Sequence, residues 1–240
     1  MKHLALSLAL LLILGVAAIP VFAEPTYSQS PYLDTLVESG ELPPVEERLP
    51  DNPTVIDEYL DEYKENIGVG KYGGDLRLVT TNTGGYSGDM LVAISENLLV
   101  MESVNSGEIH PNLVDDYQVS DDMTVHTFKL KKGLKWSDGT EVTMEDFRFA
   151  IEDVQLNSSI NPVTPAWLMI DGVPVKFDIV DDTTFTLTFA NGYGGLATHL
   201  SCNGWKDYTY LCLPSAFLKP FHLAYAEECH GSVERQMEIY

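Results

Sequence analysis

A polar, glycine-rich loop is the first stretch whose residue types could bind a ligand. Residues 75–80 read as a strand, and an apolar helix is expected from Met90 to Leu99, capped by Asp89. A loop at the carboxyl end of a strand presents backbone amides where open sheets bind ligands. The predicted ligand-binding residues of this loop are Thr81, Asn82, Thr83, Gly84, Gly85 and Tyr86. An ordinary connection is the alternative, and a phosphate loop is excluded because neither G-x-x-x-x-G-K-[ST] nor G-x-G-x-x-G is present.

Trp205 is the second candidate for contact with a ligand. It lies in a loop with a glycine before it, Cys202-Asn203-Gly204-Trp205, and Tyr208 and Tyr210 are close by in the sequence. Aromatic side chains with a polar tip suit a cleft that accepts varied chemical groups. The spacing therefore predicts that Trp205 faces a ligand, and packing in the interior is the alternative.

The three cysteines are at positions 202, 212 and 229. In an exported chain, Cys202 and Cys212 can form a disulfide that closes a short loop and leaves Cys229 free. Three reduced, partly buried thiols are the alternative. No C-x-x-C is present and the histidines of this region are scattered, so neither a metal nor another cofactor is predicted.

Catalytic patterns are missing from the sequence. It contains no G-x-S-x-G and no H-E-x-x-H. The aspartate pairs at 115–116, 121–122 and 181–182 are expected at turns, where aspartate is a common solvated turn residue. We therefore predict a protein that is not an enzyme. A secreted hydrolase is kept as an alternative, although no nucleophile–base pair stands at a recognised spacing.

The elements that position these residues are organised around the stretch Asp122–Val154. Phe128 and Leu130 lie two residues apart and share one face of a predicted strand. A basic corner follows, in which lysines surround Gly133, and then a turn at Ser137-Asp138-Gly139.

A capped helix completes this stretch. Thr143 is the predicted N-cap, and Asp146 stands three residues on, in the capping-box position. The apolar face of the helix is predicted from its spacing to contain Met144, Phe147, Ala150, Ile151 and Val154. Further along, residues 175–180 and 184–189 alternate cleanly, and 181–183 joins them in a predicted β-hairpin.

Composition and charge limit the kinds of partner. The chain has 240 residues, enough for one or two domains, with 36 acidic and 14 basic residues and a formal net charge of -22. A nucleic-acid partner is not expected, because neutralising phosphates requires a basic surface. A solvated acidic surface explains the charge, and a preference for cationic ligands is the alternative.

The N-terminus has the pattern of a signal peptide. Lys2 precedes an apolar run from Leu4 to Ile19, and Val21-Phe22-Ala23 resembles a cleavage site. We predict a signal peptide over 1–23, with an uncleaved membrane anchor as the alternative. The segment 24–70 is rich in proline and acidic residues, 71–228 is the expected folded lobe, and 229–240 is a polar tail.

Several motifs resemble those of the family 5 solute-binding proteins, the peptide- and nickel-binding components of ABC importers. Residues 124–136 (TVHTFKLKKGLKW) are similar to the family's "TYTFHLRKGVKF". Residues 138–140 and 143–147 (DGT, TMEDF) are similar to "DGTPFTAEDV". Two departures are His126, where the family prefers an aromatic or aliphatic residue, and Val114, where a small residue is usual.

Further segments extend the resemblance. The segment 107–113 resembles the family's hairpin "GEIVPNLA" and places His110 in its turn, and Trp136 stands where the family has a structural aromatic. The proline-rich segment 40–55 resembles one that wraps the first lobe in one branch of the family, and 213–222 resembles that branch's "LPKHYLEKFH".

The resemblance implies a fold and a function. The expected fold class is α/β, or α+β with a mixed sheet. It is expected to resemble the N-terminal lobe of a type 2 periplasmic binding protein. It is expected to be incomplete, since family members are more than twice this length and clamp a ligand between two lobes. The implied function is capture of peptides or related small polar solutes for an ABC importer. The implied partners are permease subunits, and the full-length protein is expected to be an exported monomer. A non-transport sensor or chaperone on the same lobe is a further alternative.

Overall fold

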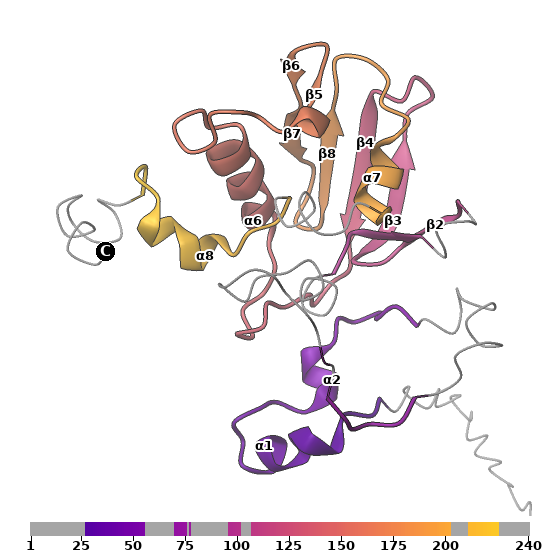
Figure 1. Ribbon diagram of the computed structural model, residues 1–240, viewed down its shortest axis with the longest axis vertical. Coiled ribbons are helices and arrows are strands. Elements are labelled where there is room, and N and C mark those ends of the chain that lie inside the picture. Colours follow the sequence, from indigo (N-terminus) through magenta and orange to yellow (C-terminus); the bar gives the residue numbers. More distant parts are fainter. Residues whose placement is uncertain are drawn as a thin grey trace, which may run out of the picture.

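The computed structural model describes residues 27–55, 70–75, 77, 96–101, 107–202 and 211–225. Its central feature is a four-stranded antiparallel sheet in the order β3-β4-β8-β7 (Figure 1). These strands are β3 (Val114–Val119), β4 (Val125–Leu130), β7 (Lys176–Ile179) and β8 (Thr184–Thr188). Two smaller sheets pair β1 (Leu99–Met101) with β2 (Ile109–Pro111) and β5 (Met169–Ile170) with β6 (Val173–Pro174).

The helices are short. They are η1 (Pro31–Leu33), α1 (Asp34–Glu38), α2 (Val45–Arg48), α6 (Met144–Arg148), η2 (Phe149–Gln155), η3 (Ala166–Leu168), α7 (Leu196–Cys202), α8 (Ser215–Leu218) and η5 (Lys219–Phe221). Figure 1 shows α1 and α2 at the end of the sheet opposite the β5–β6 hairpin. The predicted mixture of helices and sheets is confirmed, and every strand pair in the described part is antiparallel.

Strand β4 has the predicted alternation and lies between β3 and β8, so both of its edges are paired. Phe128 and Leu130 are buried, and Lys129 between them is exposed. His126, two residues earlier, is buried on the same face. The period of two therefore holds over the strand, with a histidine at one interior position.

Helix α6 begins with the predicted capping box. The Thr143 N–H donates to Asp146 Oδ2 at 2.8 Å. The helix then continues as a π-helix, η2. The prediction that Val154 lies on the apolar face is wrong, because Gln155 is buried there and Val154 is only half-buried. A π turn closes between residues i and i+5 and holds more residues than an α turn, so the face below Ile151 passes to Gln155.

The π-helix also brings Asp153 to Arg148, five residues earlier, with Nη2 and Oδ2 2.8 Å apart. Arg148 pairs with Glu145 as well, at 2.6 Å, and donates to the Tyr225 hydroxyl at 2.9 Å. These acceptors raise the Arg148 pKa, and the bond from Arg148 is the main reason that the Glu145 pKa falls to about 2. Lys219 adds a contact to Glu145 at 2.7 Å. The network therefore ties the segment 219–225 to the helix.

The predicted hairpin at 175–189 is confirmed as β7–β8, and Asp181 Oδ1 accepts from the Thr183 N–H in its turn at 2.8 Å. Near β1, two predictions are wrong. The expected helix does not extend to Leu99, since Leu99 begins β1 and pairs with Pro111. His110 lies in strand β2 and not in a turn. An apolar run such as 98–101 fits a helix or a strand, and pairing with a distant segment decided for the strand.

The prediction of a turn at the aspartates 115–116 is also wrong, because both lie within β3 and are exposed there. The pairing of β3 with β4 shifts register between Val114 and Asp116. A bulge of this kind adds a residue to one strand. The sequence pattern of two adjacent aspartates carries no signal for it. The pairs at 121–122 and 181–182 lie between strands, as predicted.

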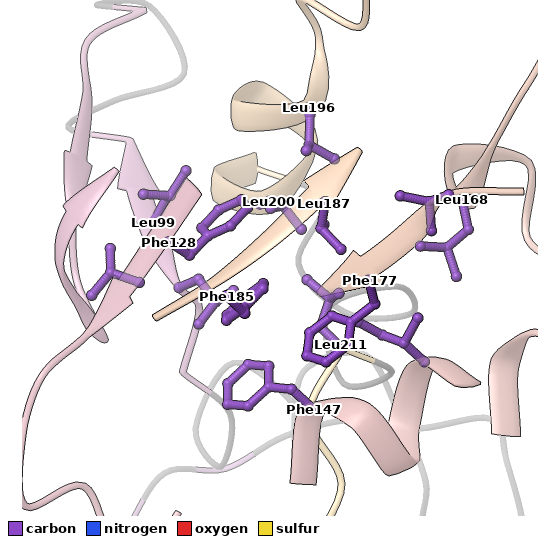
Figure 2. Close-up of a cluster of buried hydrophobic side chains, with 14 of the residues drawn as sticks. Leu99, Phe128, Phe147, Leu168, Phe177, Phe185, Leu187, Leu196, Leu200 and Leu211 are labelled. Atoms are coloured by element: carbon purple, nitrogen blue, oxygen red, sulfur yellow. The ribbon is translucent and has the colours of Figure 1, made fainter. Parts of the chain in front are cut away.

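The core gathers aromatic and leucine side chains from the sheet and its helices. Figure 2 shows Phe147 entering from α6, and Leu196 and Leu200 from α7, around Phe185. The Phe185 ring lies 5.0 Å from that of Phe128 and 4.9 Å from that of Phe147. Offset and tilted aromatic pairs at such distances add to the stabilisation from burial. Trp167 belongs to the same core and stacks on His199, with ring centroids 5.1 Å apart.

The proline-rich segment 27–55, here called the leader, contacts the basic corner at residues 131–135. The Asp51 N–H donates to the Lys132 carbonyl at 3.0 Å, and the buried Lys131 Nζ donates to Thr54 Oγ1 at 2.8 Å. Lys135 Nζ donates to the Glu47 carbonyl. Residues 47–54 therefore lie along the corner that follows β4. Residues 56–69, which follow the leader, lie outside the described residues.

Gly133 is required where the leader crosses this corner. Its φ is +76°, and a Cβ would stand 3.1 Å from Asp51 Oδ1. Gly139 has a similar φ of +87° but open space around it. We expect Gly133→Ala to lower the free energy of unfolding by about 2 kcal/mol and Gly139→Ala by about 1 kcal/mol. Urea denaturation of both variants measures the difference, and equal losses would show that the leader contact contributes nothing.

Candidate functional site

The predicted ligand-binding residues lie outside the described part of the chain. This applies to the loop Thr81–Tyr86 and to Trp205. The described chain resumes after them at Glu96 and at Leu211. Both of these residues line one cavity, of about 510 Å³. The segments that follow the two predicted stretches therefore meet at a single place, and this cavity is the candidate site.

The cavity wall is mostly apolar. Its aliphatic and aromatic lining comes from β4, α6, α7 and the segments that connect the elements. It comprises Leu98, Leu113, Leu130, Leu134, Trp136, Val142, Phe147, Leu200, Leu211, Leu213 and Pro214. Glu96, Lys135, Ser137 and Cys212 supply its polar atoms. A lining of this kind can bury an apolar group or one face of a ring, with few polar groups to orient it.

Trp136 is predicted to be a structural aromatic, and the structure places it half-buried at the cavity wall. Its Nε1 donates to Asp146 Oδ2 at 3.2 Å. The turn that carries it closes as predicted, with the Thr140 N–H donating to Asp138 Oδ1 at 2.9 Å. The indole is therefore held by the same carboxylate that caps α6.

Asp146, the residue before Phe147 of the cavity wall, also binds a segment far away in the sequence. Its Oδ1 accepts from the Ser215 N–H at 2.8 Å and from Ser215 Oγ at 2.6 Å. The carboxylate is 3% exposed, so these bonds replace water almost completely. The sequence pattern revealed only the capping role of Asp146, because no spacing rule connects residues 146 and 215.

Cys212 lies at this wall as a free thiol. Burial, and then the charge of Asp146, raise its pKa well above the ordinary thiol value, so the neutral form predominates. Cys202 ends helix α7. The disulfide between Cys202 and Cys212 stays a prediction for the oxidised protein.

The described residues contain neither a cluster of metal ligands nor a membrane-spanning helix. No three histidine, cysteine, aspartate or glutamate side chains lie there close enough together to hold a metal ion. None of the described helices is both long and apolar enough to span a bilayer.

Comparison with known proteins identifies the lobe. Residues 108–226 match the model of the bacterial extracellular solute-binding proteins, family 5. The periplasmic alpha-galactoside-binding protein of Rhizobium meliloti (strain 1021) is 29% identical over 229 residues, covering 89% of this chain and 31% of that protein. The chain thus spans about a third of the length of this curated relative.

Two solved structures share the fold over most of the chain. An oligopeptide-binding protein OppA has 32% identity and a TM-score of 0.69, and covers 87% of this chain and 30% of its own. The periplasmic binding protein MelB of Agrobacterium fabrum C58, in complex with stachyose, has 28% identity and a TM-score of 0.65, covering 84% and 31%. The fold is that of part of a type 2 periplasmic binding protein, as predicted. Over residues 108–226, the chain belongs to family 5 of the bacterial extracellular solute-binding proteins.

Proposed function

We propose that the chain is the N-terminal lobe of an exported solute-binding component of an ABC importer, and that its solute is an oligosaccharide. The supporting observation is the similarity to the alpha-galactoside-binding protein, which extends over 89% of the chain and therefore well beyond the family segment. The structural similarity to a stachyose complex supports the same class of solute, because stachyose is itself an α-galactosyl oligosaccharide.

The sequence-based expectation of a peptide remains as the second candidate. It is favoured by the similarity to the oligopeptide-binding protein OppA, which covers 87% of the chain. The Leu-rich cavity would suit an aliphatic side chain, whereas the half-buried Trp136 offers a ring face to a sugar. The relatives are transport binding proteins, so the hydrolase alternative gains no support from them. A permease partner and an extracytoplasmic location follow from the same proposal.

Binding to a chimeric protein tests the solute class. Residues 27–225 replace the corresponding part of the alpha-galactoside-binding relative, which supplies the rest of a two-lobed protein. Calorimetric titration with stachyose and with a tetrapeptide is expected to show saturable heat with stachyose alone. Saturable heat with the peptide alone would replace the oligosaccharide by the second candidate. A folded chimera that binds neither would contradict the solute-binding role of this lobe, and the unmodified relative is the positive control.

A further inference from the structure

His126 is an interior residue of the sheet, and nothing in the proposed function requires a histidine there. It lies on β4 opposite Leu187 of β8 and is 1% exposed. Its ring packs edge-on against Phe189, with centroids 5.6 Å apart.

The imidazole makes one polar side-chain contact within the described residues. Its Nδ1 lies 2.7 Å from the Tyr117 hydroxyl of β3, and the two rings are stacked. Its Nε2 is buried and makes no hydrogen bond. In the neutral ring the Tyr117 hydroxyl complements the role of Nδ1 alone. An imidazolium would in addition bring a positive charge and a second N–H donor into this interior site.

Among the described residues, no negative charge faces this ring from the elements packed against it. Asp115 and Asp116 of β3, and Asp122 in the turn before β4, are exposed, and β8 carries no charged residue. Tyr117 cannot supply a charge, since burial raises its pKa to about 12. Burial lowers the His126 pKa below its ordinary value, and the nearby Met123 carbonyl opposes this without outweighing it.

We propose that the buried His126–Tyr117 pair makes the central sheet sensitive to acid, so that the folded chain loses stability in mildly acidic solution. The direction of the pH dependence follows from the linkage between proton binding and folding. The unfolded chain takes up a proton as the pH falls below about 6.5, while the folded sheet keeps His126 neutral. Stability is therefore full above this pH, and it falls until the pH reaches the lowered pKa of the folded state.

Urea denaturation of the 240-residue chain between pH 5 and 8 tests this sensitivity to acid. Most carboxylates titrate below that range. The folding equilibrium constant is expected to fall by up to about tenfold per pH unit below pH 6.5. In His126→Phe this part of the pH dependence should disappear. His110→Phe, which changes a histidine of β2, is the matched control and should retain it.

An NMR titration of the His126 ring protons in the unmodified chain gives a second measurement that does not depend on any variant folding. It should show His126 titrating below pH 6.5. Titration at or above 6.5, or an unchanged pH dependence in His126→Phe, would overturn the proposal. His126→Leu, which is smaller, serves if phenylalanine does not fit the site.

Discussion

Replacing Asp146 by alanine is expected to lower the free energy of unfolding by about 4 kcal/mol. The buried carboxylate accepts hydrogen bonds from the Thr143 N–H, Trp136 Nε1 and both donors of Ser215. Its removal leaves the two buried donors of Ser215 without an acceptor, each at a cost of about 1–3 kcal/mol. Chemical denaturation measures the total, and loss of the capping box at α6 contributes part of it.

Asp138→Ala is the matched control for this prediction. Asp138 also accepts from a backbone N–H and a hydroxyl, both of Thr140, but it is exposed to water. We expect Asp138→Ala to cost about 0.5–1 kcal/mol, because water replaces the lost partner. A cost equal to that of Asp146→Ala would refute the role of burial at Asp146.

A double-mutant cycle isolates the connection across the cavity wall. Ser215→Ala removes one of the five donors to the Asp146 carboxylate while leaving the Ser215 backbone N–H in place. The coupling between Asp146→Ala and Ser215→Ala should be about 1–2 kcal/mol. Additive effects would mean that the carboxylate acts only as a helix cap. In that case residues 213–215 would be held by packing and by the backbone hydrogen bond from the Leu213 N–H to the Asp146 carbonyl.

Replacing Phe185 by alanine is the second change with a large expected effect, about 4 kcal/mol. The side chain is 0% exposed and contacts the rings of Phe128, Phe147 and Phe177. Alanine would leave a cavity between the sheet and α6, and it would remove three aromatic pairs at once. The measurement is the midpoint of urea unfolding, followed by circular dichroism.

Phe217→Ala provides the comparison at the surface. Phe217 is 64% exposed, so its truncation should change the free energy of unfolding by no more than about 0.5 kcal/mol. A domain of ordinary stability can be unfolded by a loss as large as that at Phe185. Phe185→Leu, with an expected loss of about 1.5 kcal/mol, keeps the prediction measurable. A loss below that of Phe217→Ala would show that Phe185 is not part of the core.

The elements around residues 122–154 and 175–189 could be predicted from the sequence, because their signals are local. Period-two alternation places Phe128 and Leu130 on one face of β4, and the T-x-x-D spacing of Thr143 and Asp146 marks the start of α6. Hydrogen bonds between near neighbours in the chain dominate such turns and caps. The family could be inferred for the same reason, since its motifs lie in these segments.

Tertiary structure alone decided where these elements depart from regular patterns. The π-helix moves Gln155 into the place expected for Val154, and a register shift puts the aspartates 115–116 within β3. Leu99 became a strand residue because Pro111 pairs with it. The register of β3 and the strand at Leu99 depend on pairing with another segment, which no local spacing can contain.

The candidate site divides in the same way. Residue types and the glycine-rich pattern by themselves pointed to 81–86 and to Trp205, and these remain predictions because they lie outside the described residues. Only the tertiary structure joined Trp136 of the cavity wall to Asp146, and Asp146 to Ser215, and placed His126 against Tyr117. The physical reason is that a buried polar side chain is satisfied by whichever partner folding brings to it, at any distance along the chain.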